Sequence, residues 1–171
     1  MNSIFKYGIF SGLVLVGFTW AGDLIFGLKP ENFEVQEVYG YASMVLGLSV
    51  IFFGVRRYRD ELEGGNISFG KALKIGVLTD LVTSTIYGVY MMIYLRWISP
   101  DFLQIYSEFY RDKIANSGLP AAEIASQLAE IDANMGLYLD VNFNSFLMFA
   151  TVFLIGAVVA LASAAILRRS S

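Results

Sequence analysis

The 171-residue sequence contains no cysteine and no histidine. The absence of cysteine excludes disulfide bonds and thiolate chemistry, and without either residue type a metal site would need a cluster of carboxylates. The acidic residues are instead scattered along the chain, and we find no serine-centred nucleophile motif and no phosphate-binding glycine loop. We therefore expect no catalytic site, no metal site and no cofactor, and we predict that the protein is not an enzyme.

Charged residues are also scarce. They make up 16% of the chain, against about a quarter in ordinary soluble domains, while 56% of the residues are hydrophobic. The apolar residues gather in four stretches, and a helix of about 20 residues crosses the hydrocarbon layer of a membrane. The sequence predicts an all-α fold, a four-helix transmembrane bundle forming one membrane domain over residues 1–171, with spans at about 4–26, 38–55, 72–95 and 143–167.

The basic residues are unevenly distributed between the segments that flank these spans. Eight of the 12 fall at the N-terminus, in the segment between the second and third spans, or at the C-terminus: Lys6, Arg56, Arg57, Arg59, Lys71, Lys74, Arg168 and Arg169. The other two connecting segments hold four basic residues and most of the acids. Because basic loops stay on the cytoplasmic side, we expect a multi-pass protein of the cytoplasmic (inner) membrane with both termini in the cytoplasm.

The segment at about 100–137, between the third and fourth spans, has helical periodicity of its own. Ser99 and Pro100 are typical of an N-cap and a first helical position, and the run 116–118 (Asn-Ser-Gly) is typical of a helix end. A second amphipathic helix follows Pro120. The pattern predicts an extracytoplasmic helical hairpin that packs over the outer ends of the spans or against a partner.

Two connections between the spans carry local signals. We expect an outer loop over residues 27–37, and on the cytoplasmic side a second helix that continues to Glu63 and is stopped by Gly64 and Gly65. Ser68 is a suitable N-cap for the third helix. Arg59 and Glu63 are spaced for an i, i+4 ion pair.

Asp80 is the only charge inside the apolar stretches of the predicted spans, residues 7–22, 38–55, 75–95 and 141–167. It falls on a stripe of small and polar residues, a pattern that marks a face packed against other helices: Ala72, Gly76, Asp80, Ser84 and Gly88, with Thr79 and Thr83 beside it. A charge at mid-helix costs about 2.5–3.5 kcal/mol on insertion scales, so a retained one indicates a role. Three interpretations stay open: a structural acid paired with Lys6 or Arg56 or hydrogen-bonded to serine and threonine, a proton or cation carrier, or a contact with a partner subunit.

Small residues at intervals of four also indicate where helices approach each other closely. The predicted packing positions are Gly8, Gly12, Gly76, Gly88, Gly156 and Ala160. Gly8 and Gly12 form a GxxxG motif, which is used either within the bundle or for dimerisation.

Polar residues near the outer boundary allow two interpretations. Asp23 and Asp140 could join Asn142 and Asn144 in a cation site, or they could simply be solvated at the membrane interface. The 14 phenylalanines and 10 tyrosines are expected at lipid-facing and interfacial positions, and they indicate no cofactor site.

Several short motifs are similar to those of a known family. They are Gly54, the run 58–60 (Tyr-Arg-Asp), Gly65, the run 67–69 (Ile-Ser-Phe), Lys71, Ala72, Gly76 and the run 98–102 (Ile-Ser-Pro-Asp-Phe). In these residues the chain resembles the bacterial integral-membrane family called domain of unknown function 4199. The resemblance implies a bacterial cytoplasmic membrane and supports four spans, but it implies no activity, ligand or catalytic residue.

These observations lead to two functional hypotheses. The first is a non-enzymatic membrane component that self-associates or serves as an accessory subunit. The alternative is a small proton- or cation-linked transporter or channel that uses Asp80. The expected partners are the lipid bilayer and either further copies of the chain or other membrane-complex subunits, and we expect no nucleic acid.

Overall fold

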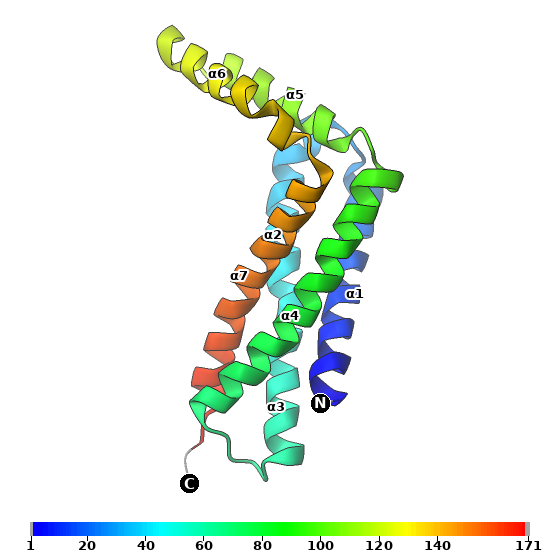
Figure 1. Ribbon diagram of the computed structural model, residues 1–171, viewed down its shortest axis with the longest axis vertical. Helices are drawn as coiled ribbons and strands as arrows, with labels where there is room; N and C mark the ends of the chain where they lie inside the picture. Colours follow the sequence, from blue (N-terminus) through cyan, green and yellow to red (C-terminus); the bar gives the residue numbers. More distant parts are fainter. Residues whose placement is uncertain (1, 170–171) are drawn as a thin grey trace.

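The computed structural model describes residues 2–169 and consists of helices (Figure 1). The α-helices are α1 (Asn2–Phe26), α2 (Phe33–Leu48), α3 (Val50–Leu62), α4 (Phe69–Ile93), α5 (Phe102–Ala115), α6 (Ala121–Tyr138) and α7 (Val141–Leu167). A 3-10 turn, η1 (Pro30–Asn32), precedes α2, and a π-helical turn, η2 (Tyr94–Ile98), extends α4. Within the described residues there is no β-strand, only one isolated bridge between Ile67 and Arg169.

Four helical segments are long and apolar enough to cross a membrane. They are Ser3–Phe26, Pro30–Leu62, Phe69–Ile98 and Val141–Leu167, and the second comprises η1, α2 and α3 with a single-residue interruption at Ser49. Many large apolar side chains on these segments are exposed, for example Leu24, Phe146 and Ile166. The predicted all-α four-helix bundle is confirmed, and its outward face has the composition expected for contact with lipid.

The bundle is built around α4, which packs against α1 on one side and α7 on the other. Ten residues of α4 are buried, more than in any other described helix. The core is completed by side chains such as Leu48 and Ile51 from the second segment and Val152 from α7, each fully buried. The polar face predicted for the third span therefore lies at the centre of the bundle.

The two ends of the bundle are different. The start of α1, the end of α7 and the turn between α3 and α4 lie at one end, and the hairpin of α5 and α6 lies at the other (Figure 1). α3 ends at Leu62, one residue before the predicted end at Glu63. The rest of the turn forms as the sequence predicts: Gly64 and Gly65 have φ values of 60° and 89°, and Ser68 caps α4 by accepting a hydrogen bond from the Lys71 amide. These left-handed backbone angles favour glycine.

Three local expectations were wrong. Residues 33–37 are helical instead of part of an outer loop, because Phe33 is buried beneath aromatic side chains of α5. The first hairpin helix begins at Phe102, after a turn at residues 99–101, because η2 carries the preceding helix on to Ile98. Glu63 pairs with Lys71 instead of Arg59, since its backbone has already left the helix.

The hairpin itself is confirmed, and only part of it contacts the bundle. α5 crosses the ends of the other helices, and the tip between α5 and α6 projects beyond them (Figure 1). Phe33 contacts the rings of Phe102, Tyr106 and Phe109, with centroid separations of 5.3–6.1 Å. α5 is therefore anchored to α2, whereas α6 has no buried residue in the described structure.

Candidate functional site

Asp80 lies in the interior of the bundle, where α4 meets α7. Its side chain is 0% exposed, and its Oδ1 accepts a hydrogen bond of 3.2 Å from Ser84 Oγ. Its Oδ2 has no hydrogen-bond partner among the described residues. Gly156 of α7 lies so close that a Cβ atom there would overlap the carboxyl group. The carboxyl group is thus enclosed by packed helices.

Neither basic residue proposed as a partner reaches Asp80. Arg56 pairs with Asp60 at 3.7 Å, and Lys6 is exposed, with no ion pair to Asp80 in the described part of the chain. Both lie at the turn end of the bundle, whereas Asp80 is sealed between α4 and α7. The sequence allowed two structural roles for Asp80, an ion pair with Lys6 or Arg56 and a hydrogen bond to serine or threonine. The structure contains the hydrogen bond to serine and not the ion pair.

The two threonines beside Asp80 bond to backbone instead of to its carboxyl group. Thr79 donates to the carbonyl of Ile75 at 2.8 Å. Thr83 donates to the carbonyl of Gly8 in α1 at 3.1 Å and approaches that of Thr79 at 3.2 Å. Thr83 therefore links α1 to α4 with a buried hydrogen bond.

The small residues selected from the sequence lie at contacts between helices. A Cβ atom on Gly8 would come within 2.7 Å of Val82, and one on Gly12 within 2.9 Å of Ile86. At the other face of α4, Gly76 meets Ala160 and Gly88 meets Phe149 at comparable distances. The GxxxG motif is therefore occupied within the chain, by α4.

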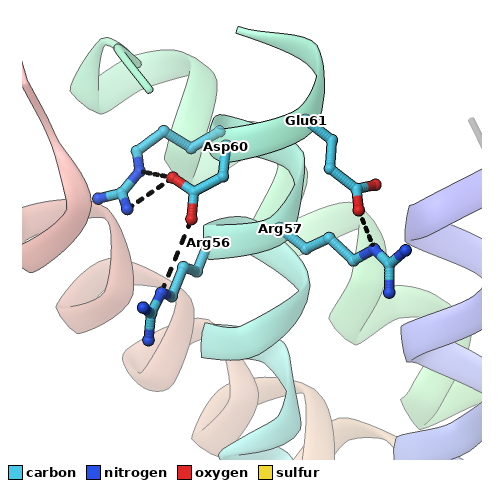
Figure 2. Close-up of polar contacts among 5 residues, drawn as sticks. Arg56, Arg57, Asp60 and Glu61 are labelled. Atoms are coloured by element: carbon cyan, nitrogen blue, oxygen red, sulfur yellow. Dashed lines mark hydrogen bonds and ion pairs between the residues drawn. The ribbon is translucent and has the colours of Figure 1, made fainter. Parts of the chain in front are cut away.

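The basic end of the bundle consists of local ion pairs (Figure 2). Arg57 pairs with Glu61 at 2.8 Å, and Asp60 contacts both Arg56 and Arg59, the latter at 2.7 Å. The arginines are thus largely neutralised by acids of their own helix. This arrangement is typical of a solvated helix end, where exposed ion pairs contribute little to stability. Because the arginines are already paired with acids, it is not typical of an anion site.

A second polar site lies at the hairpin end, where a cavity of about 420 Å³ opens between α1, α2, α4, η2, α5 and α7. Among the described residues, its wall contains two carboxylates, Asp23 and Glu37, and no lysine or arginine. It also contains six of the 10 tyrosines: Tyr39, Tyr41, Tyr87, Tyr94, Tyr106 and Tyr110. The remaining wall is mainly apolar.

Glu37 connects the cavity to the hairpin. The hydroxyl groups of Tyr106 and Tyr110 both donate to its Oε1, the latter at 2.5 Å. Burial, together with these bonds to Glu37, raises the pKa of Tyr106 above its usual value. Burial also raises the pKa of the Tyr110 hydroxyl. Both phenols therefore stay protonated, as hydrogen-bond donation to a carboxylate requires.

Three of the four basic residues in the outer segments are engaged elsewhere. Lys113 pairs with Glu34 at 2.7 Å, Arg96 donates to Asn142 at 3.0 Å, and Arg111 pairs with Asp132. The salt bridge with Glu34 raises the pKa of Lys113. Among the described residues, neither Asp23 nor Glu37 forms an ion pair.

The cation site considered from Asp23, Asp140, Asn142 and Asn144 is not assembled. Asp140 caps α7 by accepting from the Phe143 amide at 2.6 Å, and Asn142 is the acceptor for Arg96. Asn144 donates to two backbone carbonyls of its own segment. Across the described residues no group of three or more acids is placed to hold a metal ion.

Sequence reasoning missed the cavity. It treated the tyrosines as interfacial and did not single out Glu37, because the residues of the wall come from segments far apart in the chain. One signal was present: tyrosines at 87, 90 and 94, then at 106 and 110, recur at helical spacing on either side of a turn. That spacing indicates one tyrosine-rich face on each helix, but not that the two faces meet.

These features define the class of the molecule: an all-α protein with four membrane-length helices around an enclosed acid and a hairpin across one end. Over residues 6–169 the chain matches the family described as "Protein of unknown function (DUF4199)", and it belongs to that family. The family resemblance seen in the sequence is confirmed. Neither the curated proteins nor the solved structures that were compared gave a match.

Proposed function

We propose that the protein is a non-enzymatic component of a bacterial cytoplasmic membrane, in which a rigid four-helix scaffold carries a binding region at its hairpin end. The observation that carries the proposal is the seal around Asp80. A carrier must expose its charged site to water in some state, whereas this carboxyl group is 0% exposed and lies against Gly156. We assign Asp80 to packing of α4 against α7.

The proposed orientation follows the distribution of charge. Lys6, the arginines of α3, Lys71, Lys74 and Arg168 belong to the turn end, and acids predominate at the hairpin end. The positive-inside rule favours the turn end and both termini in the cytoplasm, with the hairpin outside. The lipid bilayer is then the solvent of the exposed apolar side chains.

An accessory role fits the projecting half of the hairpin. α6 contains apolar side chains such as Ile124, Leu128 and Ile131, none of which is buried in the described structure. A further copy of the chain or another membrane subunit is the proposed partner. The intramolecular use of Gly8 and Gly12 favours an association through the hairpin over one through the GxxxG motif.

One observation favours the second candidate, a proton- or cation-linked transporter. Oδ2 of Asp80 has no hydrogen-bond partner among the described residues, and an unsatisfied polar atom in a bundle interior is costly. A rearrangement that admits water beside α7 would give this atom a partner and create a pathway.

Reconstitution in liposomes distinguishes the two candidates. The purified chain and its Asp80→Asn variant would be placed in vesicles containing a pH-sensitive dye, and proton and sodium gradients applied. We expect no flux above that of empty vesicles from either protein. Flux by the wild type that is abolished in a well-folded Asp80→Asn chain would overturn the proposal and establish transport.

A further inference from the structure

We propose that the cavity at the hairpin end binds an amphipathic organic cation, an ammonium group attached to an apolar or aromatic body. The proposal goes beyond the scaffold role and concerns a different part of the molecule from Asp80. It rests on the composition of the cavity wall and on the contacts that occupy the neighbouring charges.

The first argument is charge. Two carboxylates, Asp23 and Glu37, line a mainly apolar cavity that contains no lysine or arginine. Both are partly buried, and neither forms an ion pair among the described residues. A carboxylate that is removed from water needs an opposite charge or several hydrogen bonds to offset its desolvation. Glu37 receives two hydrogen bonds from tyrosines, but neither acid has an opposite charge beside it within the described residues. A cation supplies that charge, whereas an anion would be repelled and an uncharged lipid chain would supply none.

The second argument is that the neighbouring basic residue Lys113 is paired with an acid outside the cavity. Lys113 lies beside a tyrosine of the wall, with its Nζ 5.7 Å from the centroid of the Tyr110 ring. It forms its salt bridge with Glu34, an exposed acid that does not line the cavity. No lysine or arginine of the described residues forms an ion pair with Asp23 or Glu37, so a cation from outside can do so.

The third argument is the aromatic content of the wall. Six tyrosines line the same cavity as the two acids, and aromatic rings attract cations through their π faces, most effectively where water is excluded. The contact between Lys113 and Tyr110 is an example of this attraction at the same end of the molecule. A volume of about 420 Å³ falls in the range of small-molecule sites.

Glu37 has an oxygen available for such a ligand. Tyr106 and Tyr110 both donate to Oε1, and no described residue donates to Oε2. The two phenols hold the carboxylate in place from α5, which forms part of the cavity wall. The ligand therefore meets an acid that is already oriented, and less conformational entropy is lost on binding.

The test uses the full-length chain in detergent and two probes of similar size, phenyltrimethylammonium and benzenesulfonate, with affinity measured by calorimetry. We expect the cation to bind and the sulfonate not to bind. The double substitution Asp23→Asn with Glu37→Gln retains shape and hydrogen-bond acceptors, and we expect it to weaken binding of the cation at least about tenfold. The matched control is Glu31→Gln, an exposed acid outside the cavity wall, which should leave the affinity within about twofold.

A measurement on the wild type keeps the test independent of whether the double variant folds. A water-soluble carbodiimide modifies accessible carboxyl groups, and mass spectrometry locates them. The cation should protect Asp23 and Glu37 but not Glu31. Equal binding of the sulfonate, unchanged affinity in a folded double variant, or no protection of either acid would overturn the proposal.

The same chemistry is offered by a free amine and by the ammonium headgroup of a lipid. Nanodiscs made with phosphatidylethanolamine and with phosphatidylglycerol alone distinguish these sources. Weaker binding of the probe in the ethanolamine discs would assign the cavity to a lipid headgroup, and equal binding would assign it to a free cation. Absence of binding in both kinds of disc would contradict the inference.

Discussion

Gly156 of α7 lies directly against the Asp80 carboxyl group of α4, and a Cβ atom at position 156 would overlap Oδ1. Hydrogen in place of a side chain is therefore what allows an acid to be enclosed between these helices. The close approach of α7 leaves the carboxyl group 0% exposed, and its hydrogen bond from Ser84 offsets part of the cost of that burial.

Substitution of Gly156 by alanine tests this contact. We expect Gly156→Ala to destabilise the bundle by about 1–3 kcal/mol, the usual cost of overpacking, since either α7 or the carboxyl group must move. The measurement is unfolding in detergent. Gly17→Ala is the matched control, because a Cβ atom there meets nothing within 4 Å, and it should be neutral or slightly stabilising. Equal stability of the two variants would contradict the packing of α4 on α7.

Thr83→Val removes the hydrogen bond between α4 and the Gly8 carbonyl of α1 while retaining side-chain shape. We expect a loss of about 0.6–1 kcal/mol in the free energy of unfolding, the usual range for hydrogen bonds in membrane helices. Thr85→Val serves as the comparison, because Thr85 is exposed and bonds only within its own helix. The interpretation fails if the Thr85 variant loses as much stability as the Thr83 variant.

Phe33→Ala should release the hairpin from α2. Phe33 is 1% exposed and contacts three aromatic side chains of α5, and loss of a buried phenylalanine costs about 3–5 kcal/mol. We expect amide hydrogen exchange in α5 to accelerate by at least about 100-fold, with little change in α4. The control is Val35→Ala, at a position that is 56% exposed. Unchanged exchange in α5 would show that Phe33 does not anchor the hairpin.

The stability that the tyrosines bound to Glu37 contribute should depend on pH in a defined direction. Burial and the bonds to Glu37 raise the pKa of Tyr106 in the folded chain, so its contribution to stability is fully present below about pH 10 and is lost as the pH rises through the raised value. In Glu37→Gln a neutral amide replaces the carboxylate, and the pKa of Tyr106 should fall, although burial keeps it above its usual value. Near-ultraviolet absorbance of phenolate measures this shift, with Glu31→Gln as the control; a titration curve unchanged by Glu37→Gln would contradict the described contact.

The absence of native cysteine makes the orientation directly testable. Single cysteines would be introduced at Asn66, in the turn between α3 and α4, and at Ser117, in the hairpin tip; both residues are exposed. An impermeant maleimide added to intact cells should label Ser117→Cys, and should label Asn66→Cys only after permeabilisation. The reverse pattern would place the basic end outside and refute the proposed topology.

The sequence alone determined the class of fold, the number of membrane-length helices, the hairpin, and the residues through which α1, α4 and α7 approach one another. It could do so because hydrophobic length and the spacing of small residues are local properties of one helix. Only the tertiary structure decided that Asp80 pairs with Ser84 and not with Lys6 or Arg56, and that Phe33 extends α2 into the expected loop. The cavity is also visible only in the tertiary structure. Asp23, Glu37 and Tyr106 come from three different helices, and side chains so far apart in the chain meet only once those helices have packed.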